Sequence, residues 1–151
     1  MKDLFIEKMY ELSKKPYQKF FKKGKAWDAN VSKLIQHPKD SLGYHLGCFL
    51  LKYNFEIQPK LEDHDVIHVL TNTGISVEEE IGMQYYLLGN GKQSLYLWMV
   101  IFSGTLFYPT QFSYFKQQYK RGKTAHEFYG LDFLNMLSVP LTHIQQTFNI
   151  K

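Results

Sequence analysis

Residues 63–91 read DHDVIHVLTNTGISVEEEIGMQYYLLGNG, and they contain two helix signals separated by a turn. The first signal, at residues 63–70, has apolar side chains at the spacing of one helix face. Turn-forming residues follow at 71–74. Ser76 and Glu79 then fit a capping box, in which an N-cap serine pairs with a glutamate at the third helical position. The closing GNG ends the second helix. We therefore predict two antiparallel helices joined by a short turn.

The rest of the chain has the same 3.6-residue period, and alternation of the strand type is rare. We predict an all-α fold, a single-domain bundle of about seven to nine helices that spans residues 1–151, because this length suits one sizeable core. The other predicted helices cover residues 4–12, 27–36, 40–53, 95–102, 112–119 and 140–148, with Asp40 as an N-cap and Pro140 in a first turn.

The charged residues argue against one class of partner and favour another. Of the 18 basic residues 17 are lysines, and Arg121 is the only arginine. Because arginine is the usual reader of guanine edges and the usual phosphate clamp, we expect no nucleic-acid partner. Seven of the 14 acidic residues lie between residues 56 and 80, where Lys60 is the only base. This local negative charge suits a bound cation.

Location and membrane contact rest on weaker signals. Cys48 is the only cysteine and gives no sign of an oxidising compartment. The N-terminus resembles neither a secretory signal nor a transit peptide, so we expect a cytoplasmic protein. Residues 14–25 carry six lysines among aromatic residues, as a solvated connector or a membrane-surface contact would. Leu95–Phe102 is apolar but far shorter than the ~20 residues of a membrane span, so we predict a buried helix there.

A metal site is the chemistry that the sequence predicts best. His64 and His68 are four residues apart, so on a helix they share one face about 6 Å apart at Cβ. The short turn places Glu80, one turn into the second predicted helix, at a similar height to His68. Glu79 serves the cap, which leaves Glu80 free to turn inward. Asp65 is either a further oxygen ligand or a group that orients His64. Nitrogen and oxygen donors together favour a divalent ion, zinc first and iron or manganese as alternatives. The competing interpretation is an ordinary surface pair of histidines.

At these residues the sequence resembles the coenzyme Q biosynthesis protein four family. The run Asp63-His64-Asp65-Val66-Ile67-His68-Val69-Leu70, followed after nine residues by Glu80, is similar to the family motif. The resemblance covers roughly residues 38–150, whereas residues 1–37 match poorly. Supporting segments are found at residues 40–43, 80–84, 122–123, 129–133 and 140–141.

The resemblance implies more than the residues alone. It implies that His64, Asp65, His68 and Glu80 are the metal ligands. It also implies an all-helical homodimer that binds a prenylated quinone precursor or another isoprenoid lipid, peripherally on the inner face of a membrane. The family acts in ubiquinone synthesis, and it is described both as an organiser of the biosynthetic enzymes and as the factor that removes the ring C1 carboxyl oxidatively.

Three functions therefore remain open at the level of sequence. The first is a metal-dependent decarboxylase, or an accessory to one, acting on a prenylated aromatic carboxylate. The second is a non-catalytic lipid-binding scaffold, and the third is a metal-dependent hydrolase. For the lipid tail we predict a groove beside the helix at residues 95–102. Its predicted lining residues are Leu97, Trp98, Ile101 and Gly104.

Overall fold

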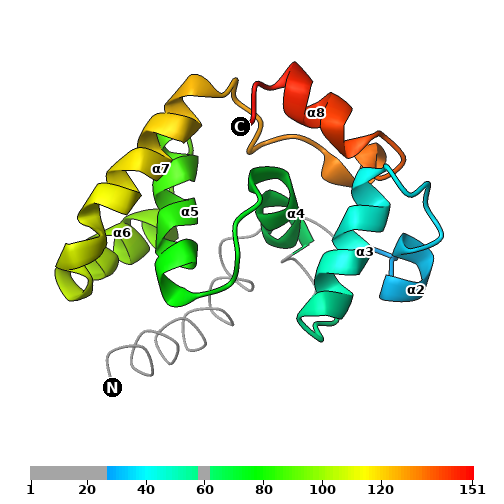
Figure 1. Cartoon of the computed structure of the whole chain (residues 1–151), viewed down its shortest axis with the longest axis horizontal. Coiled ribbons are helices and arrows are strands. Elements are labelled where there is room, and N and C mark those ends of the chain that lie inside the picture. Colours follow the sequence, from blue (N-terminus) through cyan, green and yellow to red (C-terminus); the bar gives the residue numbers. More distant parts are fainter. Residues whose placement is uncertain (1–26, 58–61) are drawn as a thin grey trace.

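A computed structural model of the protein describes residues 27–57 and 62–151, and the regular elements of this part of the chain are all helices (Figure 1). The predicted all-α class is confirmed. The described residues form seven α-helices and two short 3-10 turns. The α-helices are α2 (Val31–Leu34), α3 (Leu42–Lys52), α4 (Glu62–Thr71), α5 (Val77–Gly89), α6 (Leu95–Phe107), α7 (Phe112–Thr124) and α8 (Leu141–Thr147), and the 3-10 turns are η1 (Pro109–Gln111) and η2 (Phe133–Met136).

Helix α5 is surrounded by neighbours, and its closest one is α7 (Figure 1). Glycines allow the two backbones to touch. A methyl group at Gly122 of α7 would overlap the carbonyl oxygen of Tyr86, and one at Gly89 of α5 would overlap that of Tyr119. Helix α6 also packs on α5, where Gly104 lies against the side chain of Ile81. These contacts hold α5 rigidly between two partners.

The start of α3 is joined to the start of α8. Ser41 and Pro140 form an isolated antiparallel bridge. The Leu42 amide donates to Val139 O at 2.9 Å, and the Leu141 amide donates to Asp40 O at 2.8 Å. In Figure 1, α4 lies between this group of helices and the group formed by α5, α6 and α7. Helix α4 therefore faces both halves of the molecule, and two of its polar residues, His64 and His68, meet α5.

Several predicted boundaries are confirmed, and two near the start of the described chain are wrong. The helix predicted at 27–36 is only the single turn α2, because Asn30 caps it by accepting from the Lys33 amide. The N-cap of α3 is Ser41, whose Oγ accepts from the Tyr44 amide, and not Asp40. The backbone carbonyl of Asp40 serves the bridge to α8 instead. The predicted helix at 4–12 and the lysine-rich residues 14–25 lie outside the described residues.

The helix predicted at 95–102 exists but is longer, and it is not buried all round. Leu97, Ile101 and Gly104 face the core, whereas much of the remaining surface of α6 is exposed. The reason is that α6 packs on α5 with one side only. None of the described helices is long and apolar enough to cross a membrane.

Candidate metal centre

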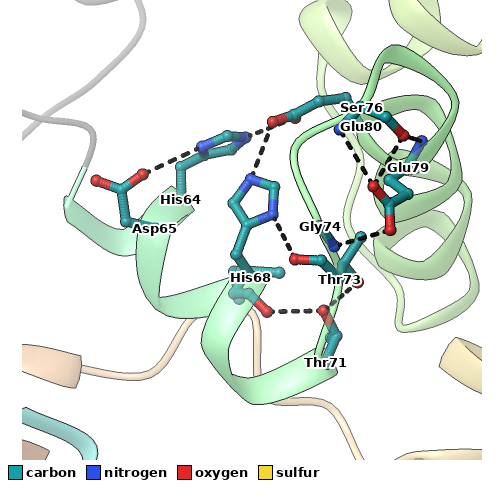
Figure 2. Close-up of polar contacts among 10 residues, drawn as sticks. His64, Asp65, His68, Thr71, Thr73, Gly74, Ser76, Glu79 and Glu80 are labelled. Atoms are coloured by element: carbon teal, nitrogen blue, oxygen red, sulfur yellow. Dashed lines mark hydrogen bonds and ion pairs between the residues drawn. The ribbon is translucent and has the colours of Figure 1, made fainter. Parts of the chain in front are cut away.

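The capping box predicted at the start of α5 is present and fixes the loop from α4. Ser76 Oγ accepts from the Glu79 amide, and the Glu79 carboxylate accepts from the Ser76 amide. The same carboxylate accepts from the Gly74 amide at 3.2 Å, and a Cβ at Gly74 would overlap it. Glu79 is therefore committed to the loop. The next residue, Glu80, turns toward α4 (Figure 2).

Three of the predicted ligands converge between α4 and α5 (Figure 2). His64, His68 and Glu80 each offer one donor atom, and these atoms all lie within 4.8 Å of one another. His64 Nε2 is 3.2 Å from Glu80 Oε2, and His68 Nε2 is 3.0 Å from Glu80 Oε1. One carboxylate thus contacts two imidazole rings, one oxygen to each. The helical spacing of four residues brings the rings together, 4.7 Å apart at their centroids.

His68 is the more tightly held histidine. It is buried and stacks on Phe49 of α3, with 5.4 Å between ring centroids. Its Nδ1 is 3.1 Å from the carbonyl oxygen of Thr73. Because a carbonyl can only accept, Nδ1 carries the proton and donates it to this bond. The Thr73 amide in turn donates to His68 O at 3.0 Å, so the turn after α4 holds both the backbone and the ring.

Asp65 lies beside His64 but on the other side of its ring. Asp65 Oδ1 is 3.8 Å from Nδ1 of His64, whereas Glu80 contacts Nε2. The structure therefore brings three of the four predicted ligands together and places Asp65 behind one of them. In metal sites the outer ring nitrogen of a ligating histidine commonly faces a carboxylate or a carbonyl, which orients the ring. Asp65 has that position for His64, and the Thr73 carbonyl has it for His68.

The charges of the site reinforce one another. Burial disfavours a charged His64, but the negative charges of Glu80 and Asp65 and hydrogen bonds to both outweigh it and raise the pKa of His64 to about 9. Burial also acts to raise the pKa of Glu80, but the charges and hydrogen bonds of His64 and His68 prevail and lower it to about 2. At neutral pH, His64 and Glu80 therefore form an ion pair, which a metal ion would have to displace.

These side chains fit a divalent transition metal. His68 donates from Nδ1 to the Thr73 carbonyl, and its Nε2 faces a carboxylate oxygen of Glu80 3.0 Å away. Such a contact is favourable only when a proton or a cation joins the two atoms. Ligands about 2.0–2.2 Å from a zinc ion in tetrahedral geometry stand roughly 3.3 Å apart, close to both Glu80 contacts. Two imidazoles and a carboxylate are also a common donor set for zinc.

The four predicted lipid-binding residues do not share one surface. Leu97 and Ile101 are core residues, and Gly104 packs against Ile81. Trp98 is about half exposed, and its Nε1–H donates to Gln93 Oε1 at 3.0 Å. A residue at position 98 lies on a different side of the helix from 97, 101 and 104, which share one face. Gly104 allows α6 to approach Ile81 of α5 closely.

Two groups at the site were missed by sequence reasoning. Phe49 stacks on His68 from a helix that is separate in sequence, and an apolar residue in an apolar helix carries no sign of such a role. Thr73 acts through its backbone carbonyl, which every residue possesses. His45, which lies on the same helix as Phe49, meets Tyr44 edge-on and is not among the three converging residues.

Comparisons with known proteins give a fold likeness. No family model matches the chain, and no curated protein matches it. A crystal structure from Nostoc punctiforme, provisionally named a ubiquinone biosynthesis protein, has the same fold with a TM-score of 0.70. The two sequences are 16% identical, and the alignment covers 99% of this chain and 81% of that one. At this identity the likeness establishes the fold.

Proposed function

We propose that this protein binds one divalent metal ion and a prenylated aromatic carboxylate, and that it acts in ubiquinone biosynthesis. The observation that carries the proposal is the convergence of His64, His68 and Glu80 within 4.8 Å. Two further findings support it. The residues 63–80 resemble the motif of the coenzyme Q biosynthesis protein four family, and the fold is like that of the Nostoc punctiforme protein. Peripheral membrane contact and a homodimer belong to the same proposal.

The ring nitrogens Nε2 of His64 and His68 and the Glu80 carboxylate would hold the metal. When bound, the ion supplies a Lewis acid that can polarise an oxygen of the ligand's head group. The protein's own residues set the geometry. The Thr73 carbonyl keeps the His68 proton on Nδ1, so that Nε2 presents a lone pair. Asp65 faces Nδ1 of His64 and favours the corresponding tautomer there.

The catalytic form of the proposal is oxidative removal of the ring C1 carboxyl, and the scaffold form is binding of the same lipid without turnover. Both forms use the same three ligands. The hydrolase considered from the sequence gains less support, because Asp65, the carboxylate between the two histidines, would have to act as its base. Asp65 lies at Nδ1 of His64, away from the face where Nε2 meets Glu80.

Metal content tests the central claim. Protein purified without an affinity tag should contain about one divalent transition ion per chain by elemental analysis. His64→Ala and Glu80→Ala should lose most of it, because each removes one of the three donors that the described residues bring together. His143→Ala is a matched control, since His143 is exposed on α8. Full metal retention by both site variants would refute the proposed centre.

Ligand binding and turnover separate the two forms. Native mass spectrometry should show a complex of the metal-loaded protein with a prenylated 4-hydroxybenzoate, and the complex should weaken in His64→Ala. Release of labelled carbon dioxide from a carboxyl-labelled substrate under oxygen would establish the decarboxylase. Binding without release, under the same conditions, would leave the scaffold. No binding with metal present would contradict both forms.

A further inference from the structure

The side of α6 that faces away from the core is apolar and exposed. Its large side chains recur at i, i+3, i+4, i+7 and i+11, the spacing of one helix face. The α6 stripe, as we call them, consists of Leu95, Trp98, Met99, Phe102 and Leu106, with exposed fractions of 64, 49, 46, 75 and 64%. A contiguous apolar surface of this kind usually marks a binding face.

The polar side chains of α6 have partners within or next to the helix. Ser103 Oγ donates to Met99 O at 2.8 Å, and Thr105 Oγ1 donates to Ile101 O at 2.7 Å. The indole N–H of Trp98 donates to the Gln93 side chain. Ser94 caps the helix by accepting from the Leu97 amide. The stripe can therefore leave water without stranding a polar side chain, which would otherwise be costly.

The sequence around the stripe contains lysines and no acidic residue. From residue 81 to residue 126 the sequence has no Asp or Glu. Lys116, Lys120 and Lys123 are exposed on α7, one face of which begins with the exposed Phe112. Helix α7 follows α6 directly after η1, and Figure 1 shows the two helices at the same end of the molecule. The helix that carries the stripe is thus followed directly by a helix with three exposed lysines, and residues 81–126 supply no carboxylate to offset them.

We propose that the α6 stripe lies in the surface of an anionic lipid bilayer, with the α7 lysines at the headgroups. Apolar side chains enter the boundary of the acyl chains, and the lysines are attracted by the negative surface potential. A second copy fits this surface less well, since a symmetric pairing would bring lysines near lysines with no acid in this part of either chain. With 13 residues, α6 is about 20 Å long, so it would lie along the bilayer rather than cross it.

This proposal specifies the membrane face of the proposed function, and it rests on α6 and α7 rather than on the metal ligands. The membrane proposal and the metal-site proposal can therefore fail separately. Every variant below should keep its metal content, so loss of membrane binding with metal retained concerns the stripe alone.

Vesicle flotation tests the stripe directly. Wild-type protein should float with vesicles of phosphatidylcholine and phosphatidylglycerol, and at least tenfold less with phosphatidylcholine alone. The double variant Phe102→Ser, Leu106→Ser should lose at least tenfold in partition coefficient. Both side chains are exposed, so thermal unfolding should not change. Leu51→Ser is the matched control, because Leu51 is a similarly exposed apolar residue on α3, and it should float like the wild type.

Two further measurements report on the contact itself. In a Trp27→Phe background Trp98 is the only tryptophan, and its emission should shift to the blue when anionic vesicles are added. Substituting Lys116, Lys120 and Lys123 by Gln should weaken binding at low salt by about fivefold for each lysine near the surface. The salt dependence of binding should fall in parallel.

Three results would overturn the proposal. Flotation of the double variant at the wild-type level would place the contact elsewhere, for example in residues 14–25. Equal binding to neutral and anionic vesicles would remove the role of the lysines. A wild-type dimer that ignores vesicles and is lost in the double variant, as measured by light scattering, would make the stripe an interface between copies.

Discussion

The two sides of helix α5 are built in different ways. Toward α7 the contact depends on the absence of side chains, since Gly89 and Gly122 bring backbone against backbone. Toward α4 it depends on charge, since Glu80 meets the rings of His64 and His68. The first contact is closed and leaves no room for a ligand. The second holds three donor atoms whose attraction for one another a metal ion can replace.

The difference indicates how one helix can serve two purposes. Backbone contact on one side fixes the position of α5, so that Glu80 is held in place whatever its charge state. The polar side can then gain or lose a proton or an ion without loss of the fold. We therefore expect substitutions on the α7 side to affect stability and substitutions on the α4 side to affect binding and pH dependence.

The largest effect should come from filling the α7 side. Gly122→Ala forces a methyl group into the carbonyl of Tyr86, and the backbone there cannot move without opening the helix pair. Overpacking costs typically 1–3 kcal/mol, and we expect a loss of about 3 kcal/mol in the free energy of unfolding by denaturant titration. Gly130→Ala is the control, because nothing lies within 4 Å of the added methyl group. Equal stability of both variants would show that the two helices are not in close contact.

On the α4 side, the metal-free protein should lose stability as the pH rises from about 6.5 to about 9. The folded pKa of His64 is raised to about 9 from an ordinary 6.5, so its stabilising charge is fully present below 6.5 and is lost above 9. For Glu80 the pKa is lowered from 4.5 to about 2, so its contribution is lost only as the pH falls through that range.

Adding metal should reverse the loss of stability that the metal-free protein shows above pH 6.5. Ligation needs neutral imidazole, so the rise in melting temperature on adding zinc should increase with pH across the window in which the metal-free protein weakens. Glu80→Gln should flatten the pH dependence of stability both without and with metal. It should also lower the free energy of unfolding at pH 6 by about 2 kcal/mol, as expected for loss of a charged hydrogen-bonding partner. Parallel melting curves for wild type and Glu80→Gln from pH 6 to pH 9 would contradict the ion pair.

The smallest effect should come from Asp65→Asn. Its carboxylate is 3.8 Å from His64 and outside the group of three donors, so the unfolding free energy should change by less than about 0.5 kcal/mol. Metal affinity, measured by competition with a chelator, should fall about tenfold through weaker orientation of the ring. A loss as complete as that of Glu80→Ala would make Asp65 a ligand, as the family resemblance implies.

Much of the site followed from local rules. The spacing of His64 and His68 places both rings on one helix face, and the capping box separates the roles of Glu79 and Glu80. Both depend on residues a few positions apart, so the fold has little freedom to change them. The position of Asp65 was less certain, because a residue next to a ligand can point to either side of it. Sequence reasoning left both roles open, and the structure places it behind His64.

The sequence by itself determined the helical class, the hairpin of α4 and α5 and the pair of histidines, because these depend on periodicity and capping within short segments. Only the tertiary structure decided which faces are covered. The uncharged run in α6 reads as a buried helix, yet α6 packs on one side and exposes Phe102 and Leu106. The supports of His68 could not be read from the sequence either, since Phe49 comes from another helix and the Thr73 carbonyl, although local, has no sequence signature. An apolar side chain shows that a residue can be buried, but only the arrangement of its neighbours determines whether it is.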